Sequence, residues 1–193
     1  MINDASSSRK FSENYFSYLK ILIDELSIEN ISKFIELILQ TRENDKSIYF
    51  IGNGGSAADA QHLASELSGK FNKDRDPLYA EALHVNSSFM TATSNDYGFE
   101  YTYARMINAC GKQGDILFAL STSGNSKNII NAIHEAKEKG MTTVGFTGSK
   151  VNDMDSICDL IIKIPNSNVP RIQESHMLLG HIICDLIEQE IFS

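Results

Sequence analysis

The sequence predicts an α/β fold in which a parallel sheet is covered by helices on both faces, as a three-layer sandwich. From about residue 46 onward, short apolar segments that suit strands alternate with longer segments that suit helices. The strand segments are apolar almost throughout, which is typical of strands that are buried on both faces. A chain of 193 residues with 42% hydrophobic residues is long enough for one such domain.

The chain begins with two predicted helices, which together cover about residues 9–44. No Pro or Gly interrupts this segment, and Ser27 is a plausible N-cap for a second helix. The segment holds more apolar residues than one stripe per helix requires. These residues could pack against their own domain or against another subunit, and we favour an oligomerisation segment.

The α/β core is expected over residues 45–193, so the whole chain forms a single domain. Gly140 is placed to end one helix and Pro165 to end one strand. The predicted strands cover 47–51, 79–85, 116–120, 141–147 and 160–164, and the predicted helices cover about 56–70, 126–139 and 169–191. Ligands of such sheets bind beyond the carboxyl ends of the strands, so we expect the site in the loops after Ile51, Leu120 and Phe146.

Charge and hydropathy argue against two classes of partner. The chain has 17 Lys and Arg against 25 Asp and Glu, and its basic residues are scattered, so we expect no nucleic acid as the main partner. No apolar run reaches the roughly 18–20 residues that span a bilayer, so we expect no membrane insertion. The first ten residues lack the apolar segment of a signal peptide, and we therefore expect a cytoplasmic protein.

The first candidate loop is rich in glycine and joins a strand to a helix. It reads Gly52-Asn53-Gly54-Gly55-Ser56, a pattern that allows a sharp turn and offers free N–H groups to an anion. The same loop resembles a dinucleotide-binding fingerprint. That alternative requires an acidic residue at the end of the second strand, and none stands near His84-Val85.

The second candidate loop is rich in hydroxyl groups. Ser121-Thr122-Ser123-Gly124-Asn125-Ser126 also lies between a strand and a helix, and its four hydroxyls exceed what an ordinary N-cap uses. The lysine of an ATP-binding P-loop is absent from it. Two such loops on neighbouring strands predict a site for one small phosphorylated molecule.

Two predicted helices carry acid–base side chains. His62 and Glu66 are four residues apart and share one helix face, although such pairs are also common on solvated helices. In the last helix, His181 follows Gly180, whose lack of a side chain would allow a close approach. The helical repeat predicts a buried side formed by Ile172, Leu179, Ile182, Ile183 and Leu186, and a second side formed by Gln173, Met177, Gly180, His181, Cys184 and Glu188.

Four motifs in order give the chain a family resemblance. They are Gly52-Asn53-Gly54-Gly55-Ser56-Ala57, Asn95-Asp96-Tyr97-Gly98-Phe99-Glu100, Ser121-Thr122-Ser123-Gly124-Asn125-Ser126, and Arg171-Ile172-Gln173-Glu174 with His176. With them the chain resembles the phosphoheptose isomerases of the sugar isomerase (SIS) fold over nearly its full length. One departure is Lys70, where the family often has Arg, which has a bidentate fork that Lys lacks.

The resemblance implies a reaction and a set of site residues. It implies a five-stranded SIS fold, a homotetramer with sites at subunit interfaces, and one zinc ion per subunit held by His62, Glu66, Gln173 and His181. Glu66 and His181 would be the acid–base pair, and we assign Glu66 as base and His181 as acid. We also consider His176 a candidate contact with a neighbouring subunit. The candidate substrate-binding residues are Asn53, Gly54, Gly55, Ser56, Glu66, Asn95, Asp96, Ser121, Thr122, Ser123, Ser126 and Gln173.

The implied reaction is the isomerisation of sedoheptulose 7-phosphate to D-glycero-D-manno-heptose 7-phosphate through an enediol. It would be the first step toward nucleotide-activated heptose for lipopolysaccharide or capsule. The alternatives are a non-catalytic SIS-fold binding protein, such as an initiator-associating protein or a sugar-phosphate sensor, and an isomerase of hexose phosphates. The presence of Glu66, Gln173 and His181 together favours an enzyme, because a binding protein has no need for all three.

Overall fold

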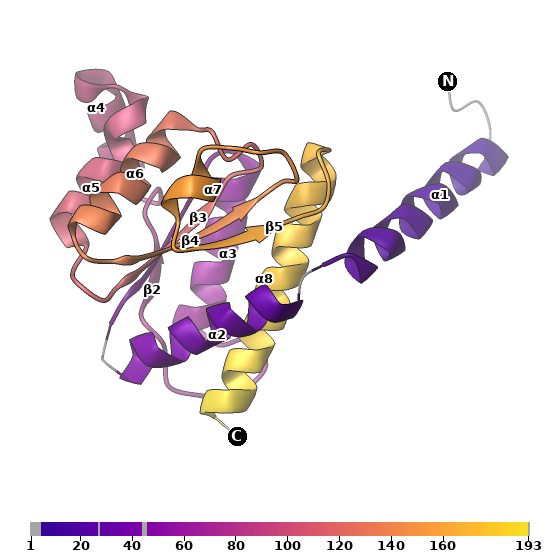
Figure 1. The fold of residues 1–193 in the computed structure, drawn as a ribbon, viewed down its shortest axis with the longest axis horizontal. Coiled ribbons are helices and arrows are strands. Elements are labelled where there is room, and N and C mark those ends of the chain that lie inside the picture. Colours follow the sequence, from indigo (N-terminus) through magenta and orange to yellow (C-terminus); the bar gives the residue numbers. More distant parts are fainter. Residues whose placement is uncertain (1–4, 27, 44–45, 193) are drawn as a thin grey trace.

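The computed structural model describes residues 5–26, 28–43 and 46–192, and it shows an α/β fold with a protruding N-terminal helix (Figure 1). The strands are β1 (Ile48–Gly52), β2 (Ala80–Ala82), β3 (Ile116–Leu120), β4 (Thr142–Thr147) and β5 (Leu160–Lys163). The helices are α1 (Ala5–Asp24), α2 (Ile28–Glu43), α3 (Gly55–Ser68), α4 (Ser87–Tyr97), η1 (Phe99–Tyr101), α5 (Thr102–Cys110), α6 (Lys127–Glu138), α7 (Met154–Ile157) and α8 (Val169–Ile191).

The five strands form one parallel sheet in the order β2-β1-β3-β4-β5. The strand order reverses between β1 and β3, and such a switch point opens a crevice at the carboxyl ends of the strands. Gly52 pairs with Leu120 in the last register position of these two strands. The glycine-rich loop and the hydroxyl-rich loop therefore start side by side, and the predicted fold class is confirmed.

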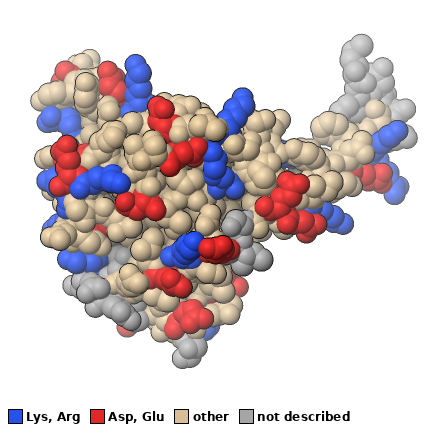
Figure 2. All heavy atoms as spheres, in the orientation of Figure 1, with Lys and Arg blue, Asp and Glu red and all other residues tan. Residues whose placement is uncertain are grey.

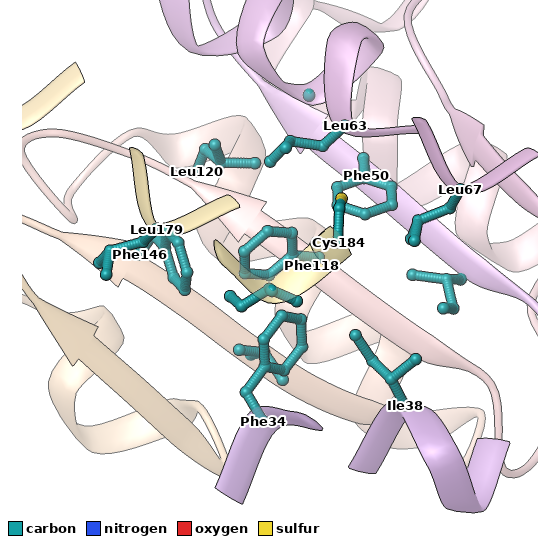
Figure 3. Close-up of a cluster of buried hydrophobic side chains, with 14 of the residues drawn as sticks. Phe34, Ile38, Phe50, Leu63, Leu67, Phe118, Leu120, Phe146, Leu179 and Cys184 are labelled. Atoms are coloured by element: carbon teal, nitrogen blue, oxygen red, sulfur yellow. The ribbon is translucent and has the colours of Figure 1, made fainter. Parts of the chain in front are cut away.

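Two apolar layers hold the helices on the sheet. On one face, α2, α3 and α8 bury a cluster in which the Phe34 and Phe118 rings stack at 4.8 Å and the Phe118 and Phe146 rings meet edge to face at 4.4 Å (Figure 3). On the other face, α5, α6 and α7 cover the strands. Each fully buried side chain of this size contributes roughly 1.5–3 kcal/mol, so these layers fix the strand ends that carry the two loops.

The two N-terminal helices have different roles in the structure. The α2 helix packs on the sheet through Phe34 and Ile38, both about 1% exposed. The α1 helix extends away from the body (Figure 1) and leaves Phe11 and Phe16 59% and 62% exposed. The α2 helix therefore belongs to the core, whereas α1 contacts the start of α8 through Tyr15 and leaves other apolar side chains exposed. The oligomerisation role expected for the segment stays a prediction. Ser27, the predicted N-cap, lies outside the described residues.

Several expectations about the elements were wrong. The helices α4, α5 and α7 were not predicted, and the strand expected over 79–85 is only Ala80–Ala82. In α8, Ile182 is 38% exposed, whereas Gly180, Cys184 and Glu188 are buried. The reason is that α8 packs against both α2 and α3, and its His176 meets Phe146 of the sheet, so its buried arc is wider and rotated from the predicted one.

His176 also departs from its prediction. It is fully buried, and its ring lies 5.4 Å from that of Phe146 in the core. A side chain in this place cannot contact a neighbouring subunit, so that prediction was wrong. His134 is exposed on α6.

On the face of the molecule drawn in Figure 2, positive and negative charges are not segregated. Figure 2 shows acidic and basic side chains interspersed over this face. Among the described helices, no segment is both long and apolar enough to cross a bilayer.

Candidate functional site

The glycine-rich loop after β1 makes a tight entry into α3. A Cβ at Gly52 would lie 2.3 Å from the Ser56 carbonyl oxygen, so only glycine fits there. Gly54 has a φ of 55°, the left-handed region that favours glycine. The Asn53 side chain exchanges two amide hydrogen bonds with Asn128 of α6, at 2.9 and 2.8 Å. This pair ties the first loop to the helix that follows the second.

The hydroxyl-rich loop after β3 is ordered by its own side chains. The Ser121 Oγ accepts a hydrogen bond from the Gly124 N–H at 3.1 Å, and the Ser123 Oγ accepts one from the Asn125 N–H at 3.2 Å. Ser126 occupies the N-cap position of α6 but makes no capping hydrogen bond with its side chain. Its hydroxyl is therefore available beside a helix N-terminus, where an anion is stabilised.

A pocket of about 330 Å³ opens beside this loop. Hydroxyl and amide side chains supply most of its hydrogen-bond donors. Its one cationic lining residue among the described residues is Lys150. The lining residues are Thr122, Ser123, Asn125, Gly148, Ser149, Lys150, Val151, Asn166, Ser167, Val169 and Ile172. The volume suits a small ligand, and the donors suit a phosphate ester.

Sequence reasoning found only part of this pocket. The loop after β4 was expected to belong to the site, although Ser149 and Lys150 were not singled out. Asn166 and Ser167, which follow β5, were missed altogether. Backbone hydrogen bonds join the loops after β3, β4 and β5. The Ser149 N–H donates to the Asn166 carbonyl at 2.8 Å, and the Gly148 N–H donates to the Thr122 carbonyl at 3.3 Å. The signal that could have found them is their position after the last two parallel strands.

His62, Glu66 and His181 form a separate cluster on α3 and α8. The His62 Nε2 and Glu66 Oε1 atoms are 2.9 Å apart, and the rings of His62 and His181 lie 5.2 Å apart. One ligand atom from each of the three side chains falls within 4.8 Å of the others. The side chains of His62 and Glu66 are 48% and 20% exposed, so the cluster is open to solvent on one side. The Phe71 ring lies 5.4 Å from the His181 ring and covers another side.

The cluster offers donors that suit a zinc ion. Two imidazoles and one carboxylate form a ligand set found in catalytic zinc sites, which keep a further position open for water or substrate. The three donors come from two helices that pack closely. The residues present therefore fit a metal, and they equally fit an acid–base pair with a third polar neighbour.

Gln173 lies apart from the other three predicted ligands. A Cβ at Gly55 would come within 2.4 Å of the Gln173 Nε2 atom, so the amide rests against the first turn of α3. Gly55 precedes His62 by seven residues, or about 10 Å of helix rise, and Gln173 precedes His181 by eight residues, or about 12 Å. Within one protomer, Gln173 belongs to the entrance of α3 rather than to the His–Glu cluster.

The remaining predicted residues occupy exposed positions. Asn95 and Asp96 are near the end of α4, where the Asn95 Nδ2 donates to the Asp96 Oδ1 at 2.9 Å. They do not line the 330 Å³ pocket, and neither do Glu66 and His181. Lys70 is exposed after the end of α3. Within a single protomer, the hydroxyl-rich pocket and the His–Glu cluster are therefore two separate groups of residues.

Asp59 is an ionisable group close to the cluster. Burial raises the pKa of Asp59 to about 6, and the nearby His62 opposes this shift. Its Oδ2 atom is buried and has no hydrogen-bond partner among the described residues. A carboxyl group in such surroundings favours its protonated form.

The chain is similar to known proteins over most of its length. The SIS domain family matches residues 11–148. The phosphoheptose isomerase of Clostridium acetobutylicum is 45% identical over 173 residues, which is 90% of this chain and 88% of that protein. The phosphoheptose isomerase of Sulfurimonas denitrificans is 47% identical over 169 residues, covering 88% of this chain and 87% of that protein.

The solved structure of a phosphoheptose isomerase from Neisseria gonorrhoeae superposes with a TM-score of 0.88 at 36% identity. The match covers 94% of this chain and 98% of that one.

Proposed function

The chain belongs to the SIS domain family and, within it, to the phosphoheptose isomerases, and from this premise we propose which residues carry its reaction. It is an aldose–ketose isomerase that converts sedoheptulose 7-phosphate to D-glycero-D-manno-heptose 7-phosphate. The observation that carries the assignment of roles is the convergence of His62, Glu66 and His181 within 4.8 Å. This reaction would supply the first intermediate toward nucleotide-activated heptose for a surface glycan, and we place it in the cytoplasm.

We assign the removal of the carbon-bound proton to Glu66. Its carboxylate removes a proton from C1 of the ketose while the C2 carbonyl oxygen gains one, which gives the enediol. The enediol then loses the proton on O1 and receives one at C2, which gives the aldose. His181 exchanges the protons on the two oxygens. General acid–base groups of this kind each contribute typically about 10²–10⁴-fold to the rate.

We propose a zinc ion as cofactor, one per subunit, bound by His62, Glu66 and His181. The family resemblance implies Gln173 as the fourth ligand, but its amide rests beside Gly55, so within one protomer the fourth position is left open. When bound, the ion would polarise the substrate oxygens as a Lewis acid. In this proposal His62 is a ligand only, whereas Glu66 and His181 would serve both as ligands and as the acid–base pair. The donor set of the cluster supports this proposal.

The phosphate group is assigned to the hydroxyl-rich pocket. Thr122 and Ser123 line the pocket and supply neutral donors, and Lys150 supplies a positive charge. Ser126 does not line the pocket, but its hydroxyl at the start of α6, which makes no capping hydrogen bond, adds a donor on the same loop. Because the pocket and the His–Glu cluster are separate within one protomer, we propose that subunit contacts complete the site in a homotetramer. The exposed apolar face of α1 is suited to such a contact.

The test is direct observation of the reaction. The purified protein is incubated with sedoheptulose 7-phosphate and, separately, fructose 6-phosphate, and aldose formation is followed by NMR. We expect turnover of the heptulose, and a loss of about 10²-fold or more in Glu66→Gln and His181→Ala. His134→Ala, exposed on α6, is the control and should retain full activity. Near-normal turnover by either site variant would refute its role, and preference for the hexulose would refute the substrate.

A further inference from the structure

Outside the cluster of His62, Glu66 and His181, the chain holds a buried ion pair that the reaction does not use. The Arg75 Nε and Glu188 Oε1 atoms are 3.0 Å apart, and both side chains are only 1% exposed. Arg75 lies in the segment after α3, and Glu188 lies near the end of α8. Removing two charges from water is costly unless geometry and hydrogen bonds compensate fully, so each contact of this pair matters.

Arg75 caps the C-terminal end of α3. Its Nη2 donates to the Glu66 carbonyl oxygen at 2.8 Å, and its Nη1 donates to the carbonyl oxygens of Leu67 at 2.9 Å, Gly69 at 3.3 Å and Asp76 at 3.0 Å. The last carbonyls of a helix have no partner within the helix, and a guanidinium can satisfy several of them at once. One of these carbonyls belongs to Glu66 itself, so the cap acts on the backbone of the proposed base.

Glu188 holds the segment that follows α3. Its carboxylate accepts hydrogen bonds from the backbone N–H groups of Phe71, Asn72 and Lys73 at 2.9, 2.8 and 2.8 Å. Burial acts to raise the pKa of Glu188, but these hydrogen bonds and Arg75 outweigh it and lower the pKa from its usual value. The carboxylate therefore stays ionised beside its partners.

The pair contacts the backbone of one proposed acid–base residue directly and reaches the other through one intermediate residue. On the α3 side, Arg75 contacts the Glu66 backbone directly. On the α8 side, Glu188 fixes Phe71, whose ring lies 5.4 Å from that of His181. Glu188 is seven residues after His181, which is about two helical turns along α8. The ion pair thus connects the C-terminal end of α3 to α8 about two turns beyond His181.

We propose that Arg75 and Glu188 are positioning residues, which hold Glu66 and His181 at the separation that the isomerisation requires. The proposal rests on the acid–base roles proposed above. A displacement of about 1 Å at a catalytic group can lower the rate about 10²-fold, so a pair that fixes this separation affects turnover more than substrate binding.

The test separates turnover from binding. Glu188→Gln keeps the shape of the side chain but replaces one acceptor by a donor that faces backbone N–H groups. Arg75→Lys keeps the charge but cannot reach the four carbonyls. We expect kcat to fall about 10–100-fold in both variants, while KM changes less than about threefold. Circular dichroism and the unfolding midpoint establish whether each variant is folded. If Arg75→Lys is not folded, the kinetics of Glu188→Gln alone test the proposal.

A matched control distinguishes positioning from general loosening. Ile133→Ala removes a buried side chain from the opposite face of the sheet, far from the pair, and lowers stability without touching α3 or α8. We expect it to keep the wild-type kcat at a temperature where it is folded. A wild-type kcat in folded Glu188→Gln would overturn the proposal, as would an equal loss of kcat in Ile133→Ala.

The two proposals fail in different ways. If the acid–base roles are wrong, Glu66→Gln or His181→Ala retains turnover. If only the positioning role is wrong, those two variants lose turnover while the folded Glu188→Gln variant keeps it.

Discussion

Gly180 of α8 lies directly against Leu63 of α3. A Cβ at Gly180 would come within 2.4 Å of the Leu63 Cδ2 atom, closer than any ordinary contact. This close approach brings the two helices together beside His62 and His181, whose rings are 5.2 Å apart. The absence of a side chain at position 180 therefore helps to set the geometry of the cluster.

The first prediction concerns this contact. Gly180→Ala should gain about 1 kcal/mol from helix propensity. Overpacking against Leu63 should cost about 1–3 kcal/mol, so we expect a net destabilisation of about 1 kcal/mol. The variant should also lose turnover, because α8 must move away from α3. Urea unfolding and steady-state kinetics measure the two effects.

A double-mutant cycle checks the cause of that loss. Leu63→Ala leaves space that the methyl group added by Gly180→Ala can enter, so the two changes together should cost less than the sum of the single changes by about 1 kcal/mol. Strict additivity would show that the contact does not limit the approach of the helices.

The sequence predicted the sheet well because the physical signals for it are local. The apolar runs at Ile48–Gly52 and Ile116–Leu120 are short and bounded by turn residues, and burial on both faces allows few other arrangements. The helix over Val169–Ile191 was predicted with the correct bounds. Tertiary packing was harder to predict from the sequence. Ile182 was expected to be buried and is 38% exposed, because the buried arc of α8 depends on two neighbouring helices that the helical repeat alone cannot place.

The candidate site was predictable where residues are close in sequence or share a motif. His62 and Glu66 are one turn apart, so their contact follows from helix geometry. Ser149 and Asn166 were not found, because they join the pocket only through the order of β4 and β5 in the sheet. The Arg75–Glu188 pair was also beyond sequence reasoning, since its residues are 113 positions apart and carry no motif.

The second prediction concerns the charge in the pocket. Lys150 is the cation that lines it, and a charge-assisted hydrogen bond contributes about 1.5–3 kcal/mol. We expect Lys150→Met to raise KM for the sugar phosphate about 10-fold with little change in kcat, because the phosphate is remote from the reacting carbons. Inorganic phosphate should also inhibit this variant less. Lys137→Met, outside the pocket, should leave KM unchanged, and an unaltered KM in Lys150→Met would contradict the assignment.

The third prediction concerns metal removal. Dialysis against a chelator should lower turnover, and added Zn²⁺ should restore it. His62→Ala should bind zinc at least about 10-fold more weakly, because one of three clustered donors is lost. Metal content is measured by mass spectrometry on protein purified without nickel affinity. Full turnover in protein with negligible metal would show that the acid–base pair works without the ion.

The last prediction is a pH dependence of stability that comes from His176. Burial lowers the pKa of His176 to about 4, although the nearby Thr147 backbone opposes the shift, and the unfolded chain has a value near 6.5. Between these values the unfolded state binds more protons than the folded state. Stability from this group is therefore complete above about pH 6.5 and is lost as the pH falls toward 4.

Replacing His176 isolates this contribution. The wild-type free energy of unfolding should decrease by up to about 1.4 kcal/mol per pH unit in that window because of this one group. His176→Gln is neutral throughout, so its unfolding free energy should fall less steeply between pH 6.5 and 4, as measured by urea titrations at several pH values. His134→Gln, at an exposed position, should keep the wild-type slope. Parallel curves for wild type and His176→Gln would mean that the buried imidazole is not what weakens the fold in acid.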